Sequence, residues 1–373
     1  MRPAASATNS RVLLHAFSSF TLGGAQARFL QLVNAFGPRY RHLIVAMDDQ
    51  WEAAERLSAA VHWDQLRVPV VRGGGLDNRS AFRRVLADAR PDLVISYNWG
   101  AVEWAAANCP SISPHVHVED GFGPAETQSE LPRRVWARRV LLNAARAQVV
   151  VPSRRLRQHA RGWWIPPSRL RYIPNGVPRA ERLAADPRRG TSAAITVGTV
   201  AGLRPEKNVG RLLKAVAAVN RQHDIRLLIV GDGPQRPELE ALTAQLGLSD
   251  RVTFVGYVTN PAEYLARMDV FALSSDTEQQ PISMLEAMAL GIPVVATAVG
   301  DVQNMLPAGA GVLSRPDDQA FALALADMLA KRDEWPAWGQ RLALKVAQEF
   351  SFDRMLQNWG LVFDGRLRDV PAL

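Results

Sequence analysis

The sequence predicts an α/β protein made of two doubly wound domains with a ligand cleft between them. The first observation is an alternation of short apolar runs with helix-length amphipathic segments along the whole chain. This pattern is typical of parallel sheets with helices on both faces. The second is a break in the alternation at 175–192, a stretch rich in Pro, Gly and Arg that indicates a linker. The third is the length of 373 residues, which suits two domains.

The expected elements fall into two groups, one on each side of the linker. The expected strands are 12–16, 43–47, 66–71, 93–97, 116–118 and 148–151, then 194–200, 226–230, 252–255, 270–273 and 293–296. The clearest expected helices are 25–36, 80–89, 209–221, 237–246 and 351–363. We therefore expect an N-terminal domain at 1–178, a C-terminal domain at 179–350, and a C-terminal helix in 351–373 that packs back on the N-terminal domain. Ligands of such sheets bind at the carboxyl ends of the strands.

Charge and composition narrow the class of partner. The net charge of +8 favours anionic partners. Arginines concentrate in 133–171, where Trp136, Trp163 and Trp164 are interleaved. This cluster suits either an anionic membrane surface or a solvated face over buried tryptophans. We expect no nucleic acid as a partner, because no nucleic-acid-binding motif accompanies the cluster.

The same composition bears on localisation. No apolar run approaches the ~20 residues of a membrane-spanning helix. The single cysteine, Cys109, fits a reducing compartment. We therefore expect a cytoplasmic protein that associates peripherally with the inner face of a membrane.

The most informative stretch of the sequence is 276–295, which follows an expected apolar strand. Pro281 is a good first helical residue and Gly291 a good stop, so Glu278 is expected in the loop and Glu286 within the helix. The N-terminus of such a helix can receive an anionic group. A carboxylate in so apolar a helix needs a polar partner. Either the hydroxyl pair of a ligand or solvent is a suitable partner for Glu286.

These two glutamates belong to a sequence pattern that resembles a known family. Seven residues separate Glu278 from Glu286, and the run Glu-Ala-Met-Ala-x-Gly-x-Pro-Val-Val begins at Glu286. The pattern resembles the signature of the retaining glycosyltransferases of family 4, also called group 1 glycosyl transferases. Further pieces follow the order of that family, namely Gly23-Gly24, 174–177, 203–208 and 231–234. The resemblance implies the GT-B fold, in which two facing Rossmann-like domains border an interdomain cleft.

The resemblance also implies a donor site in the C-terminal domain. Glu286 is expected to bind the ribose hydroxyls of a nucleotide-sugar, and Glu278 to lie beside the donor sugar as a catalytic residue. The other residues expected to line the donor are Gly231, Gln280, Pro281 and Ile282.

Two cations of the same site are expected to be catalytic. Arg204 and Lys207 would bind the donor diphosphate and neutralise it as it departs. Many relatives carry an arginine five residues before the lysine, where this chain has Gly202, and we expect Arg204 to supply that charge. Taken alone, Arg204 and Lys207 would also suit a solvated basic loop.

The N-terminal domain is expected to close the donor site and to hold the acceptor. Gly23 and Gly24 would let backbone amides approach the donor phosphate, although an ordinary strand-to-helix turn would use the same residues. The family places a histidine near the reacting sugar at the end of a strand. In this chain that position is His117 or Asp120. His115 is expected to be structural.

The expected function is transfer of a hexosyl unit from a UDP- or GDP-type sugar to an acceptor hydroxyl, with retention implied by the resemblance. The acceptor would be a glycan or a lipid-linked glycan in the assembly of cell-surface polysaccharide or glycolipid. We expect no cofactor and no metal, because no Asp-x-Asp pair stands at a strand end; Asp48-Asp49 and Asp317-Asp318 are adjacent pairs. The alternatives are an epimerase or phosphorylase on the same fold, and a non-catalytic sugar-nucleotide-binding or scaffold protein.

Overall fold

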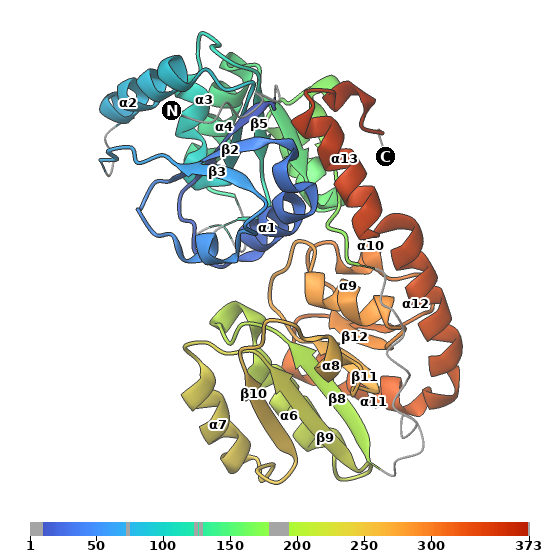
Figure 1. Ribbon diagram of the computed structural model, residues 1–373. Coiled ribbons are helices and arrows are strands. Elements are labelled where there is room, and N and C mark those ends of the chain that lie inside the picture. Colours follow the sequence, from blue (N-terminus) through green and yellow to red (C-terminus); the bar gives the residue numbers. More distant parts are fainter. Residues whose placement is uncertain (1–9, 72–74, 123–125, 127–129, 179–193, 372–373) are drawn as a thin grey trace. The chain divides into compact units, whose positions relative to one another are not determined.

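The computed structural model describes residues 10–71, 75–122, 126, 130–178 and 194–371 (Figure 1). The chain divides into two compact units. The first is Met1–Ile173 with Leu356–Leu373, and the second is Pro174–Met355. The expected boundaries after residues 178 and 350 each lie five residues from these divisions. Most of the expected linker at 175–192 lies outside the described residues.

The first unit is built on a seven-stranded parallel sheet with the order β3-β2-β1-β4-β5-β6-β7. Its strands are β1 (Val12–Phe17), β2 (Arg41–Ala46), β3 (His62–Gln65), β4 (Leu93–Tyr97), β5 (His115–Val118), β6 (Gln148–Val151) and β7 (Leu170–Tyr172). Its helices are α1 (Gly24–Phe36), α2 (Gly75–Ala89), α3 (Glu103–Ala107), α4 (Pro132–Ala144), α5 (Arg154–Gly162) and, from Leu356 onward, α13 (Phe352–Phe363).

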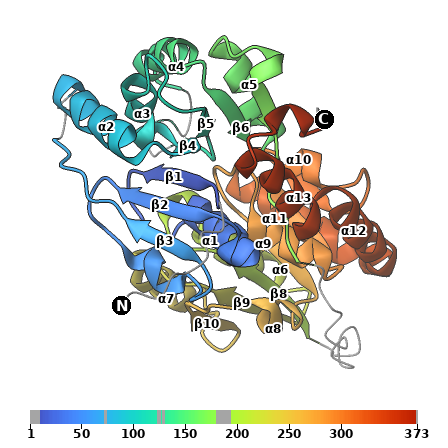
Figure 2. The ribbon, with the colours of Figure 1, turned by 45° about the horizontal axis from the view of Figure 1, so that its top comes forward.

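Helices cover both faces of this sheet. Figure 2 shows α2, α3 and α4 on one side of the central strands and α1 on the other. On the first side, Phe82 of α2 stacks on Trp104 of α3 with ring centroids 4.4 Å apart. On the second side, Phe29 of α1 packs against Phe17 of β1, and Phe363 of α13 packs edge-on against His15. These aromatic contacts form the core beneath the carboxyl edge of the sheet.

Two edge strands of the first sheet differ from the expected ones. The strand expected at 66–71 is instead β3 at His62–Gln65, which pairs with β2. Leu66, Val68 and Val70 still pack against the core, but as an irregular segment. Their alternation is thus explained by burial and not by sheet pairing. The short strand β7 was not expected, because three residues are too few to show a period.

The second unit is built on a six-stranded parallel sheet with the order β10-β9-β8-β11-β12-β13. Its strands are β8 (Ile195–Val200), β9 (Ile225–Val230), β10 (Val252–Gly256), β11 (Val270–Leu273), β12 (Val294–Thr297) and β13 (Val312–Ser314). Its helices are α6 (Val209–Val219), α7 (Arg236–Gln245), α8 (Ala262–Leu265), α9 (Ile282–Ala289), α10 (Val302–Met305), α11 (Asp318–Ala330) and α12 (Trp335–Glu349). Of these strands, only β13 was not expected.

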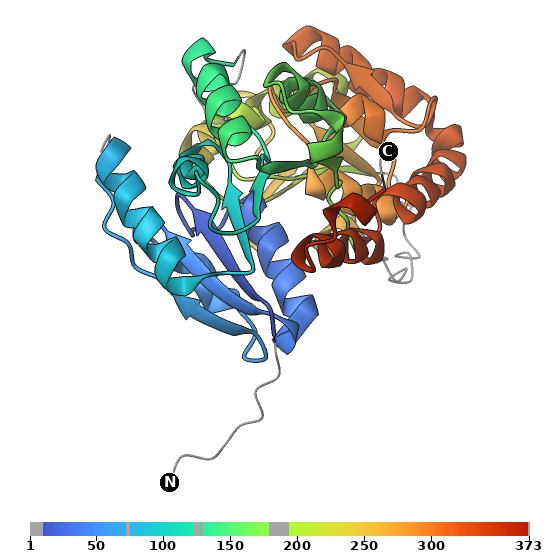
Figure 3. The same ribbon diagram turned by 90° about the horizontal axis from the view of Figure 1, so that it is seen from above.

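Alternate residues of β11 enter two separate cores, as expected for a strand covered on both faces. Val270 and Ala272 pack with residues of α6 and α11, whereas Phe271 and Leu273 pack with residues of α9 and α12. The ribbon views show helices on both sides of the strands (Figure 1 and Figure 3). Each sheet therefore has the doubly wound architecture that the alternation predicts.

The strand order reverses at one place in each sheet. In the first sheet the reversal lies between β1 and β4, and in the second between β8 and β11. Loops that leave the carboxyl ends of such neighbouring strands diverge, so a ligand can bind between them. If the predicted site residues bind a ligand, they should lie at these two positions, each within its own unit.

Candidate active site

The loops that follow β8 and β11 are bonded to each other at the reversal point of the second sheet. The backbone amide of Asp276 donates to the carbonyl of Glu206 (2.9 Å), and Ser274 Oγ donates to the carbonyl of Asn208 (2.9 Å). Asn208 has a left-handed conformation (φ +42°) and its side chain caps α6. This conformation turns the chain from the loop into the helix, and it leaves Lys207 at the junction of the two loops.

Lys207 and Glu278 form the central contact of this site. Lys207 Nζ donates to Glu278 Oε1 at 2.7 Å, and Ser275 Oγ donates to the same oxygen at 2.7 Å. The side chains are 19% and 8% exposed, so the pair is largely shielded from water. The structure thus brings together two predicted catalytic residues that lie 71 positions apart in the sequence.

Arg204, the second predicted cation, is placed differently. Its side chain is 58% exposed and pairs with Glu206 (Nε to Oε1, 3.0 Å). A Cβ atom added to Gly202 would lie 3.6 Å from Arg204 Nε. The Arg204 side chain therefore lies over Gly202, the position at which many relatives carry their arginine.

Glu286 lies within α9 as predicted, on a helix whose other residues are apolar except for Ser283. Within the described residues its carboxylate has no hydrogen bond or ion pair. Burial raises the pKa of this carboxyl to about 7. The side chain is half-buried, so water and a ligand hydroxyl pair both remain suitable partners for it. The helix itself differs from expectation by one residue, because Pro281 is its N-cap and not its first helical residue.

Gln280 connects two of the predicted motifs. The backbone amide of Asn175 donates to Gln280 Oε1 (2.5 Å), and Asn175 Nδ2 donates to the carbonyl of Gln280 (3.3 Å). Gln280 is 5% exposed, and its buried Nε2 has no hydrogen-bond partner in the described residues. The 174–177 motif therefore supports the loop that carries Glu278, and Gln280 retains one donor for a further contact. Pro281 is buried and Ile282 half-buried beside it.

Two glycines let backbone segments approach closely here. Gly231 has φ +133°, and a Cβ atom there would lie 2.0 Å from the carbonyl oxygen of Ala201. The loop after β9 thus runs directly against the loop after β8. Gly300, which the sequence reasoning missed, has φ +56°, and its Cβ would lie 1.8 Å from the carbonyl oxygen of Glu278. The signal that could have revealed Gly300 is its position just after the strand β12.

In the first unit, Gly23 and Gly24 begin α1 after the loop that follows β1. Gly23 is the N-cap and supplies no side-chain cap, and both glycines are exposed. A Cβ atom on Gly24 would meet nothing within 4 Å. The first backbone amides of α1 are therefore open to solvent, where they can donate to an anion.

His117 and His115 lie side by side on β5 and are both buried. Ser96 Oγ lies 2.9 Å from His117 Nδ1 and 2.9 Å from His115 Nε2. Burial, together with the neighbouring His117, lowers the pKa of His115 to about 3. His117 Nε2 has no hydrogen bond in the described residues and lies 3.6 Å from Glu119 Oε2. Both histidines thus share one network beneath the carboxyl edge of the sheet.

Asp120, the other acceptor-side candidate, is held by an arginine that the sequence reasoning missed. Arg28 of α1 binds both carboxylate oxygens of Asp120, with Nη2 to Oδ2 at 2.8 Å. The Arg28 guanidinium also lies over the ring of Trp359 (5.3 Å to the centroid). The amide of Asp120 donates to Asn98 Oδ1 (2.7 Å), and Asn98 follows β4. Asp120 therefore lies at the reversal point of the first sheet, with its side chain 13% exposed.

The arginine-rich stretch is divided between the interior and the surface. Arg138 is fully buried and binds Glu119 (3.0 Å) and Glu126 (3.3 Å). Trp163 is also buried. Trp136 and Trp164, in contrast, are 56% and 60% exposed, and their rings lie 5.9 Å apart. The expected basic and aromatic surface thus exists only in part.

The described residues also bear on metals and membranes. Among those residues, no three His, Cys, Asp or Glu side chains are grouped in a way that could hold a metal ion. No helix in the described part of the chain has the length and apolarity needed to cross a membrane.

Comparison with known proteins identifies the family. The profile for glycosyltransferase family 4 matches residues 22–181, and that for group 1 glycosyl transferases matches residues 194–331. The D-inositol 3-phosphate glycosyltransferase of Mycolicibacterium vanbaalenii is 30% identical over 321 residues, which cover 76% of this chain and 70% of that protein. The N-acetyl-alpha-D-glucosaminyl L-malate synthase of Bacillus anthracis is 31% identical over 172 residues, which cover 46% of this chain and 45% of that protein.

Several matches to curated relatives, including the latter, span less than half of the relative's length. Among solved structures, HepE of Anabaena in complex with UDP is similar with a TM-score of 0.77 at 20% identity, over 95% of this chain and 100% of that one. This likeness confirms the predicted fold class, with two Rossmann-like domains of the GT-B type. The chain belongs to the group 1, or family 4, glycosyltransferases.

Proposed function

We propose that this protein is a glycosyltransferase that transfers a hexosyl unit from a nucleotide-sugar to an acceptor hydroxyl. The observation that carries the proposal is the Lys207–Glu278 pair (2.7 Å) at the reversal point of the second sheet, in a chain of this family. Named relatives transfer sugars to inositol phosphate and to malate, and the solved HepE binds UDP and, in another structure, UDP-glucose. The HepE complexes support a nucleotide-sugar as the donor, and we propose UDP or GDP as its nucleotide.

In the proposed donor complex, the ribose hydroxyls donate to Glu286. This contact would give the half-buried carboxylate a polar partner that the described residues do not provide. The N-cap end of α9 lies beside Gln280 and Ile282, and we propose that these residues line the same donor site. Gly231 provides the backbone surface on which the base or ribose rests.

The diphosphate in this proposal is stabilised by cations. Lys207 and Arg204 donate to its oxygens as the bond to the sugar breaks, and this interaction grows as negative charge develops on the leaving group. Lys207 already carries a carboxylate partner, so the diphosphate must compete with Glu278 for it. The displaced Glu278 can then accept from a hydroxyl of the donor sugar. We propose on this basis that transfer requires no metal and no cofactor.

The acceptor is proposed to bind at the first unit. Asp120 is the partly exposed group at the reversal point of that sheet, and Arg28 fixes its orientation. His117 is buried one layer below it, so we propose that His117 orients the end of β5 through Ser96. The amides at Gly23 and Gly24 are proposed to contact the donor phosphate. Because the chain belongs to this family, we propose that the sugar is transferred with retention of its anomeric configuration.

The acceptor class and location are proposed from the relatives and the exposed tryptophans. Relatives act in lipopolysaccharide core synthesis and on phosphatidylinositol, so a glycan or a lipid-linked glycan is the proposed acceptor. Trp136, Trp164 and the half-exposed Val140 form an apolar surface beside Arg139, whose guanidinium lies 4.5 Å from the Trp164 ring centroid. We propose that this surface contacts the cytoplasmic face of a membrane peripherally.

A thermal-shift screen against UDP, GDP, ADP and their sugars tests the donor proposal. A ligand at about 100 times its dissociation constant should add about 2.7 kcal/mol of stability. The same shift should be lost in Lys207→Ala and kept in Lys214→Ala, which removes an exposed lysine of α6 that pairs with Asp318. If no nucleotide raises the melting temperature, or if both variants show equal shifts, the donor does not bind at Lys207.

A further inference from the structure

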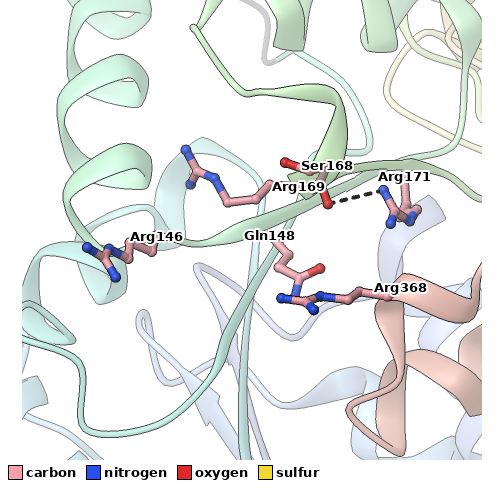
Figure 4. Close-up of a pocket in the computed structure, with 6 residues that line it drawn as sticks. All are labelled: Arg146, Gln148, Ser168, Arg169, Arg171 and Arg368. Atoms are coloured by element: carbon pink, nitrogen blue, oxygen red, sulfur yellow. Dashed lines mark hydrogen bonds between the residues drawn. The ribbon is translucent and has the colours of Figure 1, made fainter.

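The first unit has a pocket at the edge of its sheet opposite to Asp120. The pocket lies at the amino ends of β6 and β7, where Figure 4 shows its lining side chains. Its volume is about 480 Å³, within the ~300–1,000 Å³ range of small-molecule sites. Its described lining residues are Arg146, Gln148, Ser168, Arg169, Arg171 and Arg368. None of these residues is acidic, and four are arginines.

Hydrogen bonds to uncharged oxygen atoms hold two of these arginines in place. Arg171 Nε donates to the carbonyl of Leu367 (2.9 Å), and its Nη1 donates to the carbonyl of Ser168 (3.3 Å). Arg169 Nη1 donates to the carbonyl of Ala147 (3.0 Å), and its Nη2 bonds to Asn143. These partners are neutral, so they fix the guanidinium groups without balancing their charges.

The other two arginines are free of such contacts. Arg146 and Arg368 are exposed, and within the described residues neither side chain has a hydrogen bond or ion pair. Asp369, the acidic neighbour of Arg368, is bonded instead to Arg366 (2.7 Å). Burial and the nearby charge of Arg146 lower the pKa of the Arg169 guanidinium. The pocket thus holds four like charges together at an electrostatic cost that an anion would offset.

Gln148 adds a second requirement. Its Oε1 atom is buried and has no hydrogen-bond partner in the described residues. A bare inorganic anion at high pH offers no donor to this oxygen, whereas a ligand hydroxyl does. We propose that this pocket binds a phosphate group that carries a hydroxylated substituent. Guanidinium groups bind the phosphate oxygens by paired, charge-assisted hydrogen bonds, and Gln148 accepts from the hydroxyl.

This site is independent of the proposed donor site, because it lies in the first unit and uses none of the donor residues. Its ligand has two natural sources, a soluble phosphate ester and the headgroup of a phospholipid. Glycerol phosphate offers the same chemistry in both forms. The free ester and vesicles of phosphatidylcholine with phosphatidylglycerol are therefore the probes.

The test compares two charge-matched double variants of the full chain. Arg146→Gln/Arg368→Gln removes the two unpaired arginines. Arg84→Gln/Arg90→Gln is the control. Arg90 has the same left-handed backbone after a helix as Arg146 (φ +41° and +48°), Arg84 is exposed on α2, and neither lines the pocket. Calorimetry measures binding of free glycerol phosphate, and co-sedimentation measures binding to the vesicles. Lys207→Ala should leave both measurements unchanged.

We expect the pocket variant to bind free glycerol phosphate roughly 100-fold more weakly than the control, at about tenfold per arginine. A parallel loss of vesicle binding identifies the lipid headgroup as the source, and unchanged vesicle binding identifies a soluble ester. Equal behaviour of the two double variants in both assays, or no binding by the wild type, overturns the proposal. If the double variant melts at a lower temperature than the control, the two single variants replace it, because each removes only one exposed side chain.

Discussion

Replacing Glu286 with glutamine should stabilise the free protein and weaken its binding of the donor. Burial raises the pKa of Glu286 from 4.5 to about 7, so the folded protein keeps a proton that the unfolded chain releases between these pH values. The favourable contribution of the protonated group is complete below pH 4.5 and is lost as the pH rises through 7. At 1.36 kcal/mol per pKa unit, ionised Glu286 costs about 3 kcal/mol at pH 8.

Glutamine removes this cost without changing the shape of the side chain. We expect Glu286→Gln to raise the Tm at pH 8 by up to about 10 °C, at ~2–4 °C per kcal/mol for a unit of this size. The difference from the wild type should vanish at pH 4.5. Donor affinity should fall because the amide is a weaker acceptor of the ribose hydroxyls.

Thermal melting from pH 4.5 to 8 and nucleotide titration at pH 8 measure the two effects. Glu238→Gln, at an exposed position of α7, is the matched control and should keep the pH dependence of the wild type. If Glu286→Gln melts like the control at every pH, Glu286 is not a destabilising buried carboxylate. If it binds the donor as tightly as the wild type does, Glu286 does not hold the ribose.

Three further predictions follow from the contacts. Glu278→Gln frees Lys207 from its ion pair, so we expect the affinity for the nucleoside diphosphate to be undiminished and turnover to be at least tenfold slower. Weaker binding of the diphosphate, measured by calorimetry, would contradict the proposed competition between Glu278 and the diphosphate. Arg28→Ala leaves Asp120 without its buried partner and should lower the free energy of unfolding by about 3–5 kcal/mol. Asp120→Asn should instead slow turnover with a smaller loss of stability. Urea unfolding measures the effect on stability, and steady-state kinetics measure the effect on turnover. Trp136→Ser/Trp164→Ser should reduce sedimentation with anionic vesicles. Trp51→Ser should not, because this half-buried tryptophan packs against Phe20 and is not part of the proposed surface; equal sedimentation of the two variants would contradict the proposed membrane contact.

Most of the fold could be predicted because buried parallel strands are short apolar runs. The strands β4, β6 and β11 begin and end as expected, since each lies inside a covered sheet. The edge strands of the two sheets were harder to predict. Polar β3 lies beside the apolar segment that was expected to pair, and β13 has only three residues. Hydropathy reports burial, and at a sheet edge burial and pairing no longer coincide.

The candidate site could be predicted where residues are close in sequence. One motif gave Glu278 and Glu286, and the loop or helix position of each is confirmed. The Lys207–Glu278 contact joins the loops of two neighbouring strands, which no local pattern reveals. Arg28 and Arg138 were missed as buried residues for another reason. An arginine on a helix usually faces solvent, and only the positions of Asp120 and Glu119 explain why these two are enclosed.

The configuration of the product is the most direct test of the proposed reaction. The enzyme, the donor identified by thermal shift and an acceptor are incubated in excess EDTA, and NMR assigns the anomeric proton of the transferred sugar. We predict a product with the configuration of the donor, formed at the same rate with and without EDTA. Lys207→Ala should form it roughly a hundredfold more slowly or worse. An inverted product, or activity that EDTA abolishes and manganese restores, would contradict it.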